Sequence, residues 1–394
     1  MIGQRKRFWA EVDLDAAEDN FVQIRSHIKE ETKLCCVIKA NAYGNGAVQL
    51  ARLYEKLGAD FFAVSNIEEA MQLRLNGIEK PVLILGYTPI ECVGILAENN
   101  ISQAVFSEEY GVRLADEAHK KSVQIKVHIK LDTGMGRIGF DCKHGDSMEA
   151  LLSVCKNDAI EPEGIFTHFA NADSGKIGAE YTKMQFELFC GAVEKLREKG
   201  VHFSVRHCAN SATVLDYPEY QLDMVRAGVI LYGLQPAAEI LNPLPLKETL
   251  SLKSVVSQVK MIKKGDCVSY GCTFEAPYDM RVATISGGYA DGYWRSNGKN
   301  GAYVLVHGKR APIVGRVCMD QMVVDVTNIE DVKQDDVVTV MGAEQNEKIG
   351  AKELAELNGT IGYEIICAVG ERVPRFYRRN GEIVAIRDSI INVE

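Results

Sequence analysis

Residues 34–46 read LCCVIKANAYGNG, a short apolar run that ends in Lys39 and a glycine-containing turn. Seven further apolar or β-branched runs begin near residues 60, 81, 102, 125, 164, 203 and 224. The charged segments between them carry apolar residues at three- and four-residue steps, which is typical of amphipathic helices. Eight strand–helix units in roughly 250 residues predict an α/β fold with parallel strands, a closed (β/α)8 barrel of the TIM type. An open doubly wound sheet is the alternative, because a strand count does not prove closure.

The sequence changes character near residue 245, after LNPLPLKETL. The following runs, such as DMRVATIS and DDVVTVMG, read as strands, and turn signals such as KKGD, HGKR and RRNGE separate them. One short helix is expected at AKELAEL. We therefore expect two domains: residues 12–245 as a barrel that binds a cofactor, and residues 246–394 together with 1–11 as a mainly β domain.

Composition and charge narrow the class of protein. The chain has 394 residues, of which 46% are hydrophobic and 25% charged, an ordinary globular mixture. The formal net charge of −9 argues against a nucleic-acid partner. No segment is long and apolar enough to span a membrane, so we expect no membrane partner. The N-terminus lacks the apolar stretch of a signal peptide, so we expect a cytoplasmic protein. The 11 cysteines form no CxxC pair, so we expect them to be small buried apolar residues and expect no metal site.

Polar residues follow the predicted strands at the edge where barrel enzymes place their chemistry. Lys39 closes an apolar strand, where poor hydration lowers the pKa of its amine and allows Schiff-base chemistry. A single lysine at the end of a strand usually just extends its amine to solvent, so the residues around Lys39 decide whether Schiff-base chemistry is expected. Lys130 lies in the fifth strand, Arg137 in the glycine-rich loop KLDTGMGRIGF, and His168 in THFANAD after the sixth strand. Taken singly, each also fits a purely structural role.

The last two barrel strands end in RHCANSAT and VRAGVILYG. His207 precedes Asn210 and Ser211, which are suited to open a helix, while Arg226 and Gly228 follow the eighth strand. Barrel enzymes often bind phosphate in these two loops, although a serine at a helix start is usually only a cap. A lysine able to form a Schiff base, a phosphate site and an arginine together indicate pyridoxal phosphate.

Nine motifs occur in the order found in alanine racemases, and the resemblance covers essentially the whole chain. They are VIKANAYGNG, KLDTGMGRIG, FTHFANAD, ANSA, MVRAGVILYG, VSYGCTF, GYADGY, GRVCMDQM and GYEI. The first resembles the family's cofactor-lysine motif, which usually has histidine where this chain has Asn45. That departure leaves the lysine and the neighbouring tyrosine in place, and it concerns packing beside the cofactor rather than the reaction.

The resemblance implies the roles of individual residues. Lys39 would bind pyridoxal 5'-phosphate and act as one catalytic base, and Tyr270, supplied by the other subunit of a head-to-tail homodimer and hydrogen-bonded to His168, would be the second. Lys130 matches a position that is carbamylated in some relatives. The remaining implied cofactor- and substrate-binding residues are Tyr43, Arg137, His168, His207, Asn210, Ser211, Arg226, Gly228, Val229 and Tyr363 for the cofactor, and Arg137, Met319 and Asp320 for the substrate.

The chemistry agrees with these roles. Inverting Cα requires a base on each face of the substrate, and a neutral lysine and a tyrosine can supply them. Tyrosine has a reference pKa of ~10, so positive charge is needed nearby to deprotonate it; we expect His168 and Arg226 to supply it. A permanently charged Arg226 would leave the cofactor's pyridine nitrogen unprotonated and limit transamination.

Interconversion of L- and D-alanine, supplying D-alanine for cell-wall peptidoglycan, is therefore the expected function. A serine or broad-specificity racemase is the alternative on the same fold, although this chain keeps Tyr363 and shows no membrane domain. A decarboxylase of the related barrel-plus-β class would carry a cysteine motif that is not recognisable here. A non-catalytic pyridoxal-phosphate-binding protein would consist of the barrel alone.

Overall fold

Eight parallel strands form the barrel of this chain in a computed structural model that describes residues 6–145 and 147–391. They belong to a compact unit formed by residues 18–42 and 47–246. Each strand lies where the apolar runs of the sequence predict it. In chain order they are β2 (Lys33–Val37), β3 (Phe61–Val64), β4 (Val82–Ile84), β5 (Ile101–Val105), β6 (Ile125–Asp132), β8 (Ile160–Phe166), β9 (Val205–His207) and β10 (Met224–Ala227).

The strand order is β10-β2-β3-β4-β5-β6-β8-β9, so each strand lies beside its neighbour in sequence and β10 returns to β2. Near β9 and β10, the amide of Asp223 donates to the carbonyl of Arg206 and the amide of Arg226 to that of Ala209, both at 3.1 Å. These bonds nearly close the barrel, which confirms the predicted barrel rather than an open sheet. Strands β3 to β5 are buried along their whole length, which explains why they read as continuous apolar runs.

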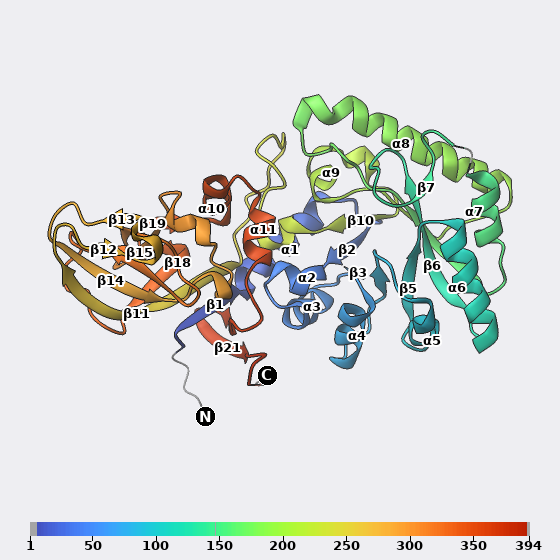
Figure 1. Cartoon of the computed structure of the whole chain (residues 1–394). Helices are drawn as coiled ribbons and strands as arrows, with labels where there is room; N and C mark the ends of the chain where they lie inside the picture. The colour runs from blue at the N-terminus through green and yellow to red at the C-terminus, as the bar shows by residue number, and fades with distance from the viewer. Residues whose placement is uncertain (1–5, 146, 392–394) are drawn as a thin grey trace. The chain divides into compact units, whose positions relative to one another are not determined.

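Helices lie on the outside of these strands (Figure 1). Their apolar residues face the barrel and their charged residues face solvent, as the three- and four-residue spacing predicts. Seven of them, within the described part of the chain, follow the strands: α3 (Ala47–Lys56), α4 (Ile67–Leu75), α5 (Val93–Glu98), α6 (Glu108–Lys121), α7 (Met148–Cys155), α8 (Gly175–Glu198) and α9 (Ser211–Asp216). Helix α1 (Leu14–His27) precedes β2.

A second compact unit is mainly β and comprises residues 6–17, 43–46 and 247–391 of the described chain. Its main sheet has the order β16-β15-β18-β11-β1-β20-β21, with β14, β17 and β19 attached to β11, β14 and β18. The strands are β1 (Phe8–Asp13), β11 (Leu250–Ile262), β14 (Met280–Ser286), β15 (Tyr303–Val306), β16 (Lys309–Pro312), β17 (Gln321–Asp325), β18 (Val337–Glu344), β19 (Glu347–Ile349), β20 (Arg375–Arg379) and β21 (Glu382–Arg387).

Turn chemistry and strand pairing account for this unit. The HGKR and RRNGE signals become tight hairpin turns, with positive φ at His307 and Gly308 and at Asn380 and Gly381. The N-terminal strand β1 runs antiparallel to β11 and parallel to β20. The predicted helix is α10 (Ala351–Asn358), but a second one, α11 (Gly362–Cys367), was not expected. The expected domain bounds, residues 12–245 for the barrel and residues 246–394 with 1–11 for the β domain, stay a prediction.

The cysteines differ in part from the expectation. Cys35, Cys36, Cys155 and Cys208 are buried as predicted, whereas residues such as Cys267 in a surface hairpin are exposed. Cys267 lies in β12 (Cys267–Val268), a two-residue strand in which Val268 is buried and Cys267 faces solvent. Within residues 6–145 and 147–391, no helix is both long enough and apolar enough to cross a membrane.

Candidate active site

Lys39 lies directly after strand β2, at the start of α2 (Lys39–Tyr43), and is followed by a backbone turn of unusual hand. Residues 40–43 all have φ between 51° and 53°, the left-handed region, which costs an L-residue ~1–2 kcal/mol. The carboxylate of Glu69 holds the start of this turn, because it accepts hydrogen bonds from the amides of Ala40 (2.6 Å) and Ser65 (2.7 Å). The Glu69 carboxylate therefore fixes the backbone beside Lys39, the lysine expected to bind the cofactor.

Four positive side chains act on His168. Burial lowers the pKa of His168 well below its usual value, and the charges of Arg226, Lys130, Arg137 and Lys39 lower it further. The imidazole is thus neutral at neutral pH, and the expectation that His168 itself supplies positive charge is wrong. The cations around it supply that charge. These five residues come from the ends of four strands, β2, β6, β8 and β10, so the barrel brings together side chains that are far apart in sequence.

Arg226 is only 4% exposed and is held entirely by neutral groups. Its Nη1 donates to Nδ1 (2.9 Å) and to the carbonyl of His207 (3.2 Å), and its Nη2 donates to the carbonyls of Thr167 (2.9 Å) and Cys208 (3.2 Å). Burial lowers the pKa of Arg226 to about 10. No carboxylate of the described residues pairs with it, so it remains a buried cation suited to a ligand that accepts hydrogen bonds.

The loop after β10 meets the start of α9. The amide of Gly228 donates to the Ser211 hydroxyl at 2.9 Å, and Asn210 caps α9 through the amide of Thr213 at 3.1 Å. Val229 follows in a short 3-10 turn and is buried. The barrel therefore brings together Asn210, Ser211, Gly228 and Val229, four of the residues expected to bind the cofactor.

Lys130 and the loop of Arg137 lie at the end of β6. Lys130 is 3% exposed, and burial, followed by the charges of Arg226 and Arg137, lowers the pKa of its amine well below the usual value. The Asp132 carboxylate shapes the loop, since one oxygen accepts from the amides of residues 134–136 at 2.9–3.1 Å. Arg137 itself is exposed. Carbamylation of Lys130 stays a prediction.

In the β unit, the catalytic tyrosine expected from the sequence and the expected substrate segment line one open cleft. Tyr270, Met319 and Asp320 share this cleft of about 500 Å³. Tyr270 is 67% exposed and Met319 51% exposed, so both are accessible in a single chain. The expected hydrogen bond from Tyr270 to His168 involves the two separate units and stays a prediction.

Asp320 is braced by an ion-pair network. Arg372 contacts Asp320 at 2.5 Å and Asp291 at 2.8 Å, and Arg7 contacts Asp291 at 2.7 Å. The Asp291 side chain is 1% exposed and also accepts from the amide of Gly288 at 3.0 Å. This network fixes the segment 318–320 against the GYADGY motif.

Tyr43 and Tyr363, both expected to bind the cofactor, lie together in the β unit with ring centroids 6.1 Å apart. Beside them, Asn45 is fully buried; its amide donates to the carbonyl of Tyr43 (3.2 Å) and accepts from Thr249 (2.7 Å). The residue that departs from the family pattern is therefore fully integrated in the packing.

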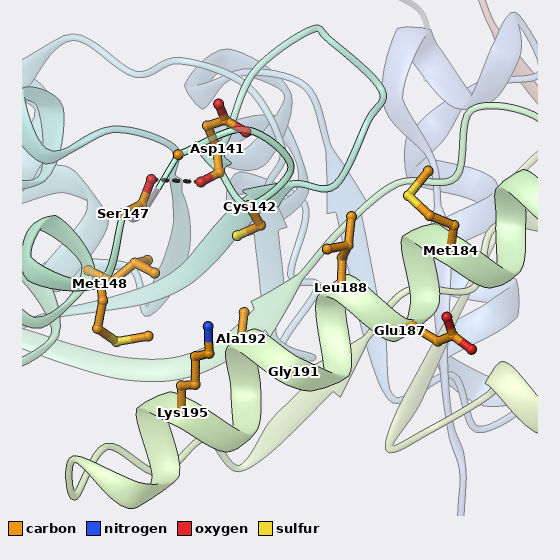
Figure 2. Close-up of a pocket in the computed structure, with 12 residues that line it drawn as sticks. Asp141, Cys142, Ser147, Met148, Met184, Glu187, Leu188, Gly191, Ala192 and Lys195 are labelled. Carbon is orange, nitrogen blue, oxygen red and sulfur yellow. Dashed lines mark hydrogen bonds between the residues drawn. The ribbon is translucent and has the colours of Figure 1, made fainter.

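A separate cavity of about 310 Å³ lies between α7, α8 and the segment after β7 (Phe140–Asp141). Figure 2 shows Leu188 and Lys195 on the α8 side of this cavity, with Asp141 and Met148 on the opposite side, so its wall mixes apolar and charged side chains. None of the site residues expected from the sequence lines it, so it is not the site described above.

Sequence reasoning missed several groups around the site. His128 and Glu163 lie in strands β6 and β8, and only the contrast with the apolar residues around it could have singled out His128, whereas Asp291 and Arg372 lie in turns of the β unit. The ion pairs of Asp291 join residues that are 81 and 284 positions apart, so no local signal exists for them.

Comparison with known proteins gives full-length matches. Residues 12–236 match the family model "Alanine racemase, N-terminal domain" and residues 249–377 match "Alanine racemase, C-terminal domain". The alanine racemase of Clostridium tetani is 42% identical over 383 residues, which is 97% of this chain and 98% of the relative. The solved alanine racemase of Clostridium difficile has a TM-score of 0.93 at 37% identity, covering 98% of this chain and 99% of that one. That of Bacillus anthracis with bound L-Ala-P has the same TM-score and identity, covering 99% and 100%.

Proposed function

The chain belongs to the alanine racemase family and is an amino-acid racemase; from this premise we propose that it interconverts L- and D-alanine with pyridoxal phosphate. Lys39 and Tyr270 of the partner subunit are the two bases. The enzyme would act in the cytoplasm, and its product D-alanine would be used to build cell-wall peptidoglycan. The Bacillus anthracis relative with bound L-Ala-P supports an alanine-shaped ligand.

The buried Arg226 carries the cofactor proposal. Its guanidinium lacks a carboxylate partner among the described residues and contacts the neutral nitrogen of His207. A pyridine nitrogen is an acceptor that matches such a donor, and the cations Lys39, Lys130 and Arg137 suit an anionic phosphate-bearing ligand. When bound, pyridoxal phosphate withdraws electrons from Cα and so weakens its bond to hydrogen. The residues present therefore fit this cofactor.

The chain's own groups divide the remaining tasks. Lys39 provides the covalent anchor and a base for one face of Cα. Ser211 and the amides after Gly228, together with Tyr43 and Tyr363, provide donors for the phosphate. Because Arg226 is a stable cation, it would keep the pyridine nitrogen of a bound cofactor free of a proton and would so disfavour transamination.

Tyr270 serves the opposite face of Cα. A phenol with a reference pKa of ~10 needs positive charge nearby to act as a base. The cations that surround neutral His168, which include Arg226 and Lys130, would supply this charge. Met319 and Asp320 share the cleft with Tyr270 and would bind the substrate carboxylate side together with Arg137. The exposure of Tyr270 in a single chain agrees with a site shared between two subunits of a homodimer.

Subunit mixing tests this proposal. Lys39→Ala and Tyr270→Phe proteins should each be nearly inactive, with a loss of ~100- to 10,000-fold for the general base. A mixed dimer would hold one site with both defects and one with neither, so activity should return after subunit exchange. Mixtures that form heterodimers but stay inactive would contradict the shared site.

The substrate is tested with the unmodified enzyme. Loss of optical rotation should be measured for both enantiomers of alanine, serine and a panel of other amino acids. We expect the highest kcat/KM for alanine in both directions. A higher kcat/KM for serine would favour the alternative of a serine or broad-specificity racemase.

A further inference from the structure

A continuous hydrogen-bond chain leads from Arg226 into the barrel interior. Arg226 Nη1 donates to His207 Nδ1 at 2.9 Å, and His207 Nε2 lies 2.8 Å from His128 Nδ1. His128 Nε2 lies 3.0 Å from a carboxylate oxygen of Glu163, which also accepts from the Ser102 hydroxyl at 2.6 Å. Two histidine side chains, His207 and His128, thus connect the carboxylate of Glu163 to the arginine expected at the cofactor.

The two ends of this chain fix the protons within it. A guanidinium can only donate, so His207 Nδ1 must be the acceptor and its proton must sit on Nε2. That proton makes His128 Nδ1 an acceptor in turn, which places the His128 proton on Nε2. The Glu163 carboxylate can only accept, and it completes the series. Every bond therefore points from Arg226 towards Glu163.

Local backbone geometry aims Glu163 at the chain. In the pairing of β6 with β8, Val127 lies opposite Pro162 and His128 opposite Gly164, so Glu163 is an extra residue in a β-bulge. Bulges redirect the side chain of the inserted residue. A Cβ at Gly164 would lie 2.4 Å from His128 Nδ1, so only glycine leaves room for the imidazole.

Packing and burial hold both histidines neutral. The His207 ring stacks on Phe166 with centroids 4.8 Å apart and planes 6° apart. Burial lowers the pKa of both His128 and His207, and it outweighs the raising effect of Glu163 on His128. Burial acts to raise the pKa of Glu163, but hydrogen bonds from His128 and Ser102 outweigh it and bring the value to about 2. The carboxylate is thus charged throughout the neutral range.

We propose that Glu163 is a positioning residue: through His128 and His207 it presents a permanent acceptor to Arg226 and so fixes the guanidinium that faces the cofactor. This inference rests on the proposed function for the role of Arg226. The hydrogen-bond series itself requires neither cofactor nor reaction. Without Glu163, His128 could carry its proton on Nδ1, His207 on Nδ1 as well, and Arg226 would face a donor.

Nitrogen-15 NMR of protein labelled at histidine, without cofactor, tests the series directly. From pH 6 to 9, His128 and His207 should both show neutral rings protonated at Nε2. Glu163→Ala should populate the Nδ1 tautomer, whereas Glu163→Gln, which keeps an acceptor oxygen, should restore the original pattern. Asp158→Ala is the matched control, because it removes the carboxylate 2.5 Å from exposed His119 and should leave both buried rings unchanged.

Kinetics then test positioning. Loaded Glu163→Ala enzyme should lose ~10- to 100-fold in kcat in both directions, as for a catalytic group misplaced by about 1 Å. KM for alanine should change less than about twofold, because Glu163 is remote from the substrate groups. Glu163→Gln should recover most of kcat.

The outcomes separate the two proposals. A wild-type His207 that is protonated at Nδ1 or charged at pH 7 overturns the positioning role, even if Glu163→Ala does not fold. A shifted tautomer with wild-type kcat also overturns it. Racemisation that persists in Lys39→Ala protein contradicts the proposed function instead, since the NMR result is independent of the cofactor.

Discussion

Asp291→Asn should destabilise the β unit, because Asp291 is the buried centre of an ion-pair network. Its carboxylate accepts two bonds from Arg7 (2.7 and 3.2 Å), one from Arg372 (2.8 Å) and one from the amide of Gly288 (3.0 Å). The two arginines are 45% and 33% exposed, so each of the three charged bonds contributes only ~0.5–1 kcal/mol. In Asp291→Asn, the side-chain NH2 group would face the backbone N–H of Gly288, so two donors would meet. This adds ~1 kcal/mol to the loss of stability. The sum is about 3 kcal/mol.

Urea unfolding measures this loss. With a slope of ~3 kcal/mol per molar urea, the midpoint should fall by about 1 M. Asp279→Asn is the matched control, since Asp279 pairs with Lys263 at 2.8 Å on the surface of the same unit and its midpoint should stay as in wild type. Because Arg372 also holds Asp320, Asp291→Asn should raise KM for alanine as well. A midpoint within about 0.2 M of wild type would refute the reasoning.

The pH dependence gives a second check. Burial acts to raise the pKa of Asp291, but bonds from Arg372, Arg7 and Gly288 outweigh it, so the folded pKa is lowered. A lowered folded value means that the stabilisation is complete above the unfolded pKa of ~3.9 and is lost as pH falls through the folded value. The gap between wild type and Asp291→Asn should therefore be constant from pH 5 to 8 and shrink below pH 4. An equal gap at pH 3 and pH 7 would show that the charge is not responsible.

Three further outcomes are expected. Arg226→Glu should lower racemisation and allow transamination, which would convert alanine to pyruvate in an amount equal to that of the bound cofactor, as measured by chromatography. Unchanged racemisation with no pyruvate would show that Arg226 does not face the pyridine ring of the cofactor. Gly287→Ala should lower the melting temperature far more than Gly301→Ala, because its Cβ would lie 2.1 Å from Phe8 whereas that of Gly301 meets nothing within 4 Å; equal losses would show that only the positive φ matters. Asn45→Ala should destabilise the fold by ~1 kcal/mol, since it removes the buried hydrogen bond that Asn45 accepts from the Thr249 hydroxyl, and a stability equal to wild type in urea would contradict this.

The barrel was predictable from sequence because parallel strands are buried on both faces and read as distinct apolar runs. The second helix of the β unit, α11, was not predictable, since its apolar residues Ile365 and Ile366 are adjacent and show no helical period. The hairpins were predictable because HGKR and RRNGE place glycine or asparagine where φ must be positive.

The candidate site was predictable only where motifs carried it. The barrel brings Lys39, Lys130 and Arg226 together, as strand ends in one barrel must. The neutrality of His168 was not predictable, because it depends on how many cations converge on one ring. Glu163 was missed for a related reason: a one-residue bulge reverses the face that an alternating strand pattern predicts.

The left-handed turn at residues 40–43, after Lys39, would suit D-residues better than the L-residues that form it. L-residues at positions 40–43 adopt backbone angles that are the mirror image of a right-handed helix, where the Cβ of an L-residue crowds the following carbonyl. A D-residue meets no such crowding there. Two of the four residues, Ala40 and Ala42, are alanines, so the backbone beside Lys39 holds L-alanine in the geometry natural to its enantiomer. Semisynthetic protein with D-alanine at both positions would form this turn without strain, and would show how far the strain itself contributes to the position of Lys39.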